Sequence, residues 1–490
     1  MKSLAAASSL LLLLVSVHDA GSDEPPSLTP FLSHISSARL LRDVEVLSAP
    51  DFHGRQTGTA SDERSAGFVA DRFASLALQS ISDSPSNWKI STAVPTNHIS
   101  EGSRLRLASK FGQWTARISH DYLPVLDSSS VDLTGSIVFV GYGISDPARD
   151  WDEYAGQNVR GKIVLFLRGQ PPREGMRVSH QDKIRYARMN GASAFLMCTG
   201  PVLTAYEARR GVGSSPVAFY NQIEAGESLP GAWLSTEVCE RILGDTQAKT
   251  NHTLRDAQEQ LNRMVIQSRA TATQADMQWR SSEERGELHN VLALLPGADA
   301  GLRSEYVLLG GHRDHFGEQA GVLFPGADDN ASGTAILLEI ARILAESNTK
   351  PKRSVLFVSF SGEEQGLWGS RLYISKPARP LNHTSAMINV DHAGIGNGRL
   401  TVGITGLPND LARGAARTAG IAERVDLYGF FPGGDHVPFK EVGIPTVTIV
   451  TGGTHPHFHT PSDTADSIQP DVLAAAARYV LALVWELANR

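Results

Sequence analysis

Metal-binding residue types follow three apolar, strand-like segments in the C-terminal half of the sequence. The segments are residues 306–311, 355–360 and 386–390. They lead into His312, into the pair Glu363–Glu364, and into Asp391. Because the carboxyl ends of parallel strands meet at one edge of a sheet, these side chains are expected to lie close together. Their joint occurrence favours a metal site over three unrelated surface turns.

Two further segments complete a set of ligands for two divalent cations. The loop at 325–333 contains adjacent aspartates, one of which could bridge two ions, and the segment at 457–464 adds an imidazole. One bridging Asp, one Glu, one Asp and two neutral His give three negative charges against four on two zinc ions, which suits a bridging hydroxide. Zinc lowers the pKa of its water to about 7. In the pair Glu363–Glu364, one carboxylate would bind metal while the other takes the proton of that water.

Taken together, these residues resemble the M28 family of co-catalytic zinc aminopeptidases and carboxypeptidases. The resemblance extends to residues 51–58, similar to the family's opening segment, and to residues 138–165, similar to the protease-associated domain often inserted there. It implies an α/β fold, a mostly parallel mixed sheet flanked by helices, with an inserted β-rich domain. The alternation of strand-like and helical runs from residue 290 onward is typical of such a fold.

The resemblance also implies a role for each site residue. The five metal ligands would be His312, Asp328, Glu364, Asp391 and His459. His312 and Asp391 would hold one zinc ion, Glu364 and His459 the other, and Asp328 would bridge both, next to a cis peptide bond to Asp329. Glu363 would be the general base. Asp314 would orient His312, since metal-bound histidines are usually held by a second partner.

Four residues are candidates for substrate contacts. Phe458 stands where some family members have a tyrosine that helps to stabilise the oxyanion, so the oxyanion donor is open. Asp435 and His436 belong to a segment that resembles another family motif near the site. Arg313 could bind a substrate carboxylate, although a structural ion pair is an equally good interpretation.

The sequence predicts several domains and export. Residues 1–20 have a basic start and an apolar core, as in a secretory signal peptide, which predicts a secreted or periplasmic protein; an uncleaved membrane anchor is the alternative. The expected domains are residues 29–122 and 286–490 for the peptidase and residues 123–285 for the inserted domain. Cys198 and Cys239 could form a disulfide after export or remain buried thiols.

Composition excludes some classes of partner. The chain has 490 residues and a net charge of −7, so it lacks the basic surface typical of proteins that bind nucleic acid or anionic lipid. No later segment is typical of a membrane span, so no stable membrane association is expected. The oligomeric state is open.

The predicted function is a secreted two-zinc aminopeptidase that removes N-terminal residues from peptides by attack of a zinc-bridging hydroxide. Three alternatives stay open. A carboxypeptidase of the glutamate-carboxypeptidase type would need a basic pocket for the terminal carboxylate of its substrate. A glutaminyl-cyclase-like transferase would use one zinc ion, and a receptor-like binding protein would have no catalytic activity.

Overall fold

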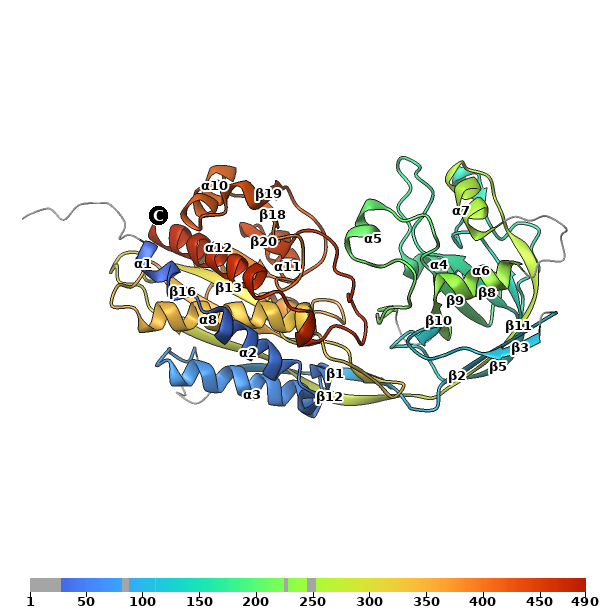
Figure 1. The fold of residues 1–490 in the computed structure, drawn as a ribbon, viewed down its shortest axis with the longest axis horizontal. Coiled ribbons are helices and arrows are strands. Elements are labelled where there is room, and N and C mark those ends of the chain that lie inside the picture. The colour runs from blue at the N-terminus through green and yellow to red at the C-terminus, as the bar shows by residue number, and fades with distance from the viewer. Residues whose placement is uncertain (1–27, 82–87, 111, 224–227, 245–252) are drawn as a thin grey trace, which may run out of the picture.

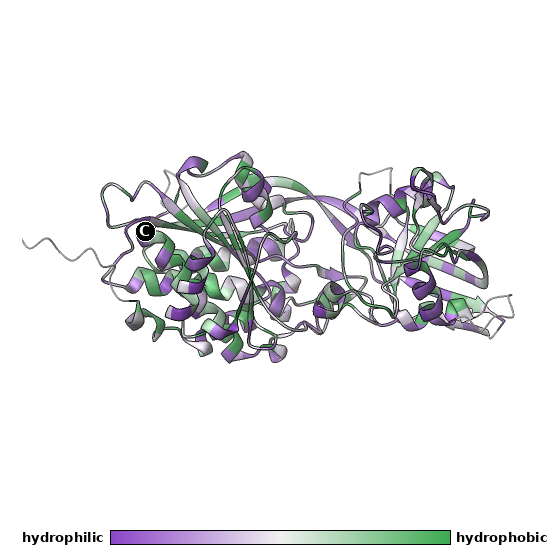
Figure 2. Cartoon of the chain, turned by 90° about the horizontal axis from the view of Figure 1, so that it is seen from above, coloured by the Kyte–Doolittle hydropathy of each residue, from purple (hydrophilic) through white to green (hydrophobic). Residues whose placement is uncertain are grey.

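The computed structural model describes residues 28–81, 88–110, 112–223, 228–244 and 253–490. The predicted signal peptide at 1–20 lies outside the described residues. The chain forms two bodies, each built on its own eight-stranded sheet (Figure 1). Hydrophobic residues gather on the strands inside both bodies (Figure 2).

The first sheet carries the strands that were expected to present the site. Its order is β1 (Lys89–Ile99), β12 (Ser281–Leu295), β16 (Ser354–Phe360), β13 (Tyr306–His312), β17 (Thr384–Val390), β20 (Thr446–Thr451), β18 (Leu400–Thr405) and β19 (Val425–Tyr428). Strands β16, β13, β17 and β20 run parallel to their neighbours in this central part. Strands β12 and β18 join them antiparallel. The predicted mostly parallel mixed sheet is therefore confirmed.

Side chains alternate between the two faces of this sheet along each strand. Because both faces carry apolar side chains, helices cover both of them. On β16, Val355 and Phe357 belong to one hydrophobic core, and Leu356 and Val358 belong to another. The larger core includes residues of α2 (Ser37–Leu47), α3 (Ala60–Ser75), α8 (Ser332–Glu346), α10 (Asn409–Thr418) and α12 (Pro470–Asn489). The smaller core includes residues of α9 (Trp368–Ser375) and α11 (His436–Glu441).

The second body is the inserted domain. Its sheet has the order β3 (Gly112–Thr115), β2 (Arg104–Ser109), β11 (Arg269–Trp279), β5 (Val131–Phe139), β8 (Ile163–Leu167), β9 (Ala194–Cys198), β10 (Gly231–Leu234) and β4 (Tyr122–Pro124). Its helices are α4 (His180–Met189), α5 (Ala205–Arg209), α6 (Thr236–Gly244) and α7 (Leu254–Asn262). Because β2 and β3 already pair with this sheet, it begins before the boundary predicted at residue 123. Its assignment as a protease-associated domain stays a prediction.

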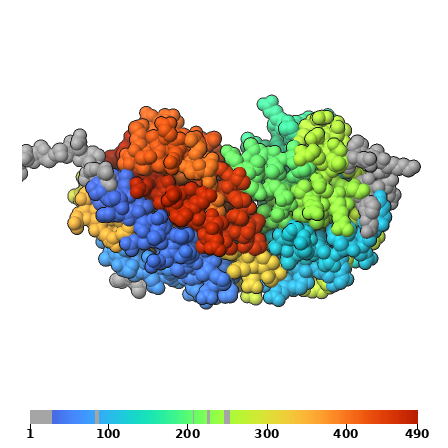
Figure 3. Space-filling model, in the orientation of Figure 1, coloured from blue at the N-terminus to red at the C-terminus, as the bar shows by residue number. Residues whose placement is uncertain are grey.

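A two-stranded ribbon joins the bodies. Strands β1 and β12 pair antiparallel from Lys89–Val291 to Ile99–Ser281, so the chain leaves the first sheet along β1 and returns along β12 (Figure 1). The space-filling view shows a notch between the two bodies (Figure 3). The backbone N–H of Ala218 in the inserted domain donates to the carbonyl of His459 in the first body, at 2.9 Å.

The remaining α-helix and β-strands of the described residues are short: α1 (Thr29–Leu32), β6 (Ser145–Asp146), β7 (Trp151–Asp152), β14 (Gly317–Gln319) and β15 (Val322–Phe324). Cys198 and Cys239 are both buried and are not joined by a disulfide. Across the described ranges, none of the helices has the length and hydropathy to span a membrane.

Candidate metal centre

Adjacent parallel strands bring the predicted ligands to one edge of the first sheet. Strand β13 ends at His312, β16 is followed by Glu363 and Glu364, and β17 is followed by Asp391. The three strands are neighbours in the order β16, β13, β17. His459 reaches the same edge from the segment between β20 and α12, and its Nε2 lies 3.5 Å from Glu364 Oε2.

The distances between these side chains match those of ligands around a shared cation. His312 Nε2 lies 3.3 Å from Asp391 Oδ1 and 3.4 Å from Asp329 Oδ1. On the other side, Asp329 Oδ2 lies 2.9 Å from His459 Nε2. Ligand atoms placed about 2.0–2.1 Å from a tetrahedral zinc ion are roughly 3.3 Å apart. The two groups of side chains therefore have the spacing of two metal positions with a common carboxylate.

That common carboxylate belongs to Asp329, so the expectation that Asp328 bridges the two ions is wrong. Asp329 is buried, and its Oδ2 faces Nε2 of His459 at 2.9 Å. Asp328 points away: its Oδ1 accepts from the backbone N–H of Gly394 at 2.7 Å and of Ile395 at 3.1 Å. The cis peptide bond is also one residue later than expected, between Asp329 and Asn330.

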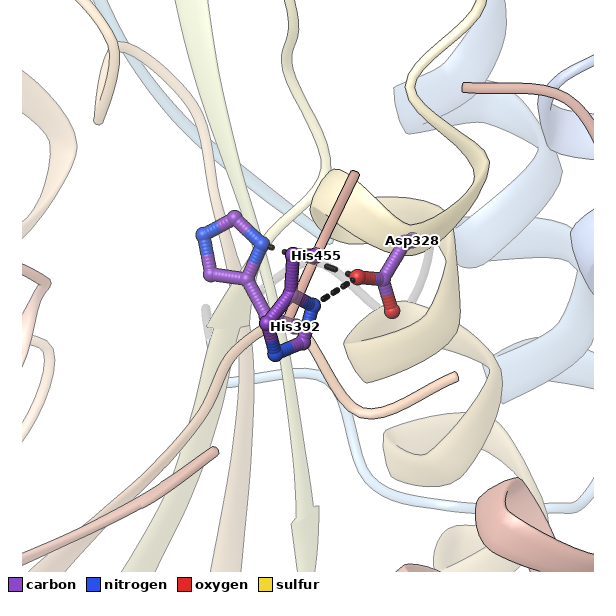
Figure 4. A group of neighbouring side chains, drawn as sticks. All are labelled: Asp328, His392 and His455. Atoms are coloured by element: carbon purple, nitrogen blue, oxygen red, sulfur yellow. Dashed lines mark hydrogen bonds and ion pairs between the residues drawn. The ribbon is translucent and has the colours of Figure 1, made fainter. Parts of the chain in front are cut away.

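Asp328 instead forms a cluster with His392 and His455 (Figure 4). Asp328 Oδ2 lies 2.6 Å from His455 Nδ1, which is too close for two ligands of one cation and fits a charge-assisted hydrogen bond. The other ring nitrogen of His455 lies 3.2 Å from the carbonyl of Thr451. Although burial lowers the pKa of His455, the Asp328 carboxylate outweighs burial and raises it. Both ring nitrogens of His455 face acceptors, and His455 and Asp328 form an ion pair beside the metal centre.

Two buried residues hold the loop that presents Asp329. The Asp463 carboxylate accepts from the backbone N–H groups of Asp328 and Asp329 at 2.9 and 3.1 Å. The Arg55 guanidinium donates to the carbonyls of Pro325 and Gly326 at 2.6 and 2.7 Å. Sequence reasoning missed both contributions, although each residue lies in a segment that was compared with the family.

The histidine ligands have partners that fix the orientation of their rings. His312 Nδ1 lies 3.2 Å from the carbonyl of Asp314 and 3.6 Å from its carboxylate. His459 Nδ1 lies 2.9 Å from the carbonyl of Ala218, so the inserted domain supplies the partner of this ligand. Such partners fix which ring nitrogen is left for a metal. A backbone carbonyl of a distant domain has no sequence signal that could have predicted this contact.

The glutamate pair also has fixed surroundings. The Asp314 carboxylate faces the backbone N–H of Glu363 at 3.3 Å and of Glu364 at 3.4 Å, and His315 Nδ1 lies 2.8 Å from Glu364 Oε1. Burial and the neighbouring carboxylates of Asp391 and Asp435 raise the pKa of Glu363 well above its usual value, against the effect of His312. Burial is the largest cause that raises the pKa of Glu364 well above its usual value, and the carboxylates of Asp329 and Glu363 raise it further. The crowding of carboxylates is unfavourable without cations, and divalent ions would relieve it.

The candidate substrate residues have different surroundings. Arg313 is completely buried and donates to Asp62 at 2.6 Å and to Ser65 at 3.0 Å, so the interpretation as a substrate-binding residue is wrong and the structural ion pair is right. Asp435 and His436 are both buried. Burial is the main cause that raises the pKa of Asp435.

Phe458 is the one candidate substrate residue that lines the cavity at the metal centre. Its ring stacks on His459 with centroids 3.6 Å apart. The cavity has a volume of about 630 Å³ and also reaches Glu363, Glu364, Asp391 and residues of the inserted domain. A volume of this order is typical of pockets that enclose small organic ligands.

This arrangement defines a class of protein: an α/β domain with clustered metal-ligating side chains at the carboxyl ends of its strands and an inserted domain over the site. The sequence model of peptidase family M28 matches residues 290–484, so this part of the chain is an M28 peptidase domain.

Comparison with known proteins gives relatives of the same kind. Aminopeptidase YwaD of Bacillus subtilis is 31% identical over 34% of this chain and 38% of its own length. Leucine aminopeptidase 1 of Arthroderma otae is 27% identical over 41% of this chain and 58% of its own length. The chain thus spans less than two thirds of each of these two relatives.

Solved structures resemble the chain over more of its length. BSAP, a zinc aminopeptidase from Bacillus subtilis, has a TM-score of 0.62 and 21% identity, and the match covers 93% of this chain and 96% of that one. At this identity the likeness concerns the fold, which extends over both bodies.

Proposed function

We propose that the protein is a two-zinc aminopeptidase that removes N-terminal residues from peptides. The observation that carries the proposal is the position of the Asp329 carboxylate, which lies 3.4 Å from His312 Nε2 on one side and 2.9 Å from His459 Nε2 on the other. The relatives matched by sequence are named aminopeptidases, which favours release of N-terminal rather than C-terminal residues.

Each metal position has a defined set of ligands in this proposal. His312 and Asp391 would hold one ion, Glu364 and His459 the other, and Asp329 would bridge them. Three carboxylates and two neutral imidazoles leave one positive charge on two zinc ions. When bound, the ions would polarise the scissile carbonyl and lower the pKa of the attacking water to about 7.

The residues of the chain would do the remaining work. Glu363 lines the cavity and is not one of the five ligands, so its carboxylate is available to take a proton from the water and return it to the leaving amine. The Asp314 carboxylate would hold Glu363 in place by accepting a hydrogen bond from the backbone N–H of Glu363, at 3.3 Å. Phe458 has no donor group, so the oxyanion would depend on the ions or on a neighbouring imidazole such as His392, whose ring centroid lies 5.3 Å from that of Phe458.

The test uses a Glu363→Gln variant. General bases typically contribute about 10²–10⁴-fold to rate, so the variant should lose at least about a hundredfold in kcat on an aminoacyl anilide. It should still bind two zinc ions per chain, as measured by elemental analysis after dialysis. Full activity of the variant would refute the assignment of Glu363 as the base.

Substrate comparison separates the proposal from its rivals. An aminopeptidase should hydrolyse an aminoacyl anilide and leave an N-blocked dipeptide intact, whereas a carboxypeptidase of the glutamate-carboxypeptidase type should do the reverse. One tightly bound zinc ion per chain would favour the transferase. A folded protein that binds no zinc would favour the receptor-like alternative.

We further propose that residues 1–20 direct export and are removed, which would make the protein secreted or periplasmic. The N-terminal sequence of the protein recovered outside the cytoplasm would test this proposal. A mature chain that still begins at Met1 would contradict it.

A further inference from the structure

Residues 209–222 of the inserted domain, which we call the docking segment, contact both ligands proposed for one zinc ion. The carbonyl of Ala218 lies 2.9 Å from Nδ1 of His459, and the backbone N–H of Ala218 donates to the carbonyl of His459 at 2.9 Å. The side-chain amide nitrogen of Gln222 lies 3.5 Å from the carbonyl of Glu364. Both ligands of this position therefore have a neighbour in the second domain.

The ligands of the other proposed position have partners within the peptidase domain itself. His312 Nδ1 lies 3.2 Å from the carbonyl of Asp314. The backbone N–H of Asp391 donates to the carbonyl of Ile449 at 3.0 Å. The two positions would share Asp329, but they differ in the domain that supports their remaining ligands.

A glycine allows the docking segment to approach the chain that carries His459. Gly211 has a φ of +65°, and a Cβ atom at this position would lie 2.4 Å from the carbonyl oxygen of His455 and 2.8 Å from Cα of Pro456. The backbone N–H of His455 also donates to the carbonyl of Arg209 at 3.1 Å. Because the atoms that a Cβ would meet belong to the backbone, a side chain at position 211 has to separate the two segments.

The docking segment is held from both sides. Within the inserted domain, the Asp127 carboxylate accepts from the backbone N–H groups of Asn221 and Gln222, each at 2.8 Å. On the other side, the ring of Phe316 meets the ring of His459 edge-on, with centroids 4.6 Å apart. Phe316 belongs to an apolar core that contains residues of both bodies: Leu123, Leu126, Ala218, Tyr220, Phe316 and Phe324. The contact with His459 is thus part of a packed interface between the domains.

We propose that the docking segment is a positioning element for the zinc ion of Glu364 and His459, so that this ion binds tightly only when the inserted domain is docked. The inference rests on the proposed two-zinc function and adds an unequal dependence of the two ions on the inserted domain. A carbonyl that accepts from one ring nitrogen of a histidine leaves the other nitrogen free for a metal and fixes its direction. Without the carbonyl of Ala218, His459 would lose this orientation, whereas His312 would keep its own partner.

The test places a methyl group between the two segments. In a Gly211→Ala variant the new Cβ would meet the backbone of residues 455 and 456 and push the docking segment away. Gly213→Ala is the matched control in the same segment, because its Cβ would lie 3.5 Å from Cδ1 of Leu203, an ordinary van der Waals contact. Zinc is measured by elemental analysis after dialysis at a fixed concentration of free zinc.

The expected change follows from the role of a partner that orients a metal ligand. Loss of such a partner typically costs about 10- to 100-fold in metal affinity. With free zinc at about ten times the wild-type Kd, the wild type and Gly213→Ala should hold about 1.8 ions per chain, and Gly211→Ala about 1.0 to 1.4. Saturating zinc should restore the kcat of Gly211→Ala on an aminoacyl anilide, which a defect confined to the shape of the cavity would not allow.

Double variants then assign the effect to one position. His459→Ala removes the ring that the docking segment orients, so adding Gly211→Ala should not weaken zinc binding further. Asp391→Ala removes a ligand of the other position, and there Gly211→Ala should still cost about 10- to 100-fold in zinc affinity. Asp127→Asn serves where Gly211→Ala does not fold: it loosens residues 221 and 222 with little change of shape and should lower the zinc content by a smaller amount.

The outcomes separate this inference from the proposed function. Wild-type zinc content in Gly211→Ala and Asp127→Asn, even with a raised KM, would overturn the positioning role and leave the two-zinc aminopeptidase intact. An equal further loss of zinc in the His459→Ala and Asp391→Ala backgrounds would overturn the assignment to one position. A wild type that holds fewer than two ions at saturating zinc and hydrolyses no aminoacyl anilide would refute the proposed function itself.

Discussion

The adjacent aspartates of the loop at 325–333 allow a direct test of the metal centre. Asp329 belongs to both ligand groups, whereas both Asp328 oxygens already accept hydrogen bonds from Gly394, Ile395 and His455. We therefore expect Asp329→Asn to weaken zinc binding at both positions. Asp328→Asn should change it much less, because its amide oxygen can still accept from the two backbone N–H groups.

The magnitude follows from the ligand set. Loss of a residue that only supports a metal ligand typically costs 10- to 100-fold in affinity, so loss of a shared ligand should cost at least about 100-fold at each position. With free zinc at about 100 times the wild-type Kd, binding stabilises the native state by about 2.7 kcal/mol per site. A 100-fold weaker site at the same zinc concentration would contribute only about 0.4 kcal/mol.

The assay is urea unfolding of the wild type and both variants, with zinc and with a chelator, together with elemental analysis after dialysis. The wild type and Asp328→Asn should retain two zinc ions and a large zinc-dependent shift of the unfolding midpoint. The Asp329→Asn variant should lose both the two zinc ions and the zinc-dependent shift of the unfolding midpoint. Two retained ions in Asp329→Asn, with loss in Asp328→Asn, would mean that Asp328 is the bridge and that the geometric reasoning fails.

Two further predictions concern residues away from the ligands. Arg313→Met leaves Asp62 buried without its partner and should lower the free energy of unfolding by about 3–5 kcal/mol; a raised KM with unchanged stability would instead indicate a substrate role. Since the pKa of His180 falls from 6.5 to about 4 on folding, stability present above pH 6.5 should be lost as the pH falls toward 4, by up to about 3 kcal/mol. Urea unfolding at several pH values should show a flatter dependence for His180→Phe, and an identical dependence would contradict the neutral, buried state of this histidine.

The inserted domain has a direct structural link to the metal centre. The carbonyl of Ala218 faces Nδ1 of the ligand His459 at 2.9 Å, and the backbone of Arg209 accepts from the N–H of His455 at 3.1 Å. A displacement of this domain would change both the shape of the cavity and the support of one metal ligand. Residues 209–218 therefore connect the inserted domain to the segment that carries His455 and His459.

Local pattern was sufficient to predict the architecture and most of the ligand types. Apolar runs that end in His312, Glu364 and Asp391 can be recognised because buried parallel strands read as short continuous hydrophobic segments. Their carboxyl ends then meet at the sheet edge for reasons of topology alone. His459 could be added because its segment resembles that of a known family.

Only the tertiary structure decided which aspartate faces the centre and what Arg313 does. In an irregular loop no repeat period determines the direction of a side chain, and here the direction depends on Asp463, 135 residues from Asp328, and on Arg55, 270 residues from Pro325. The burial of Arg313 against Asp62 is likewise a contact across 251 residues. The sequence alone determined the residue types and their order along the chain. Only the folded chain determined which charges pair, because a buried charge must be compensated by a partner that the tertiary structure brings close to it.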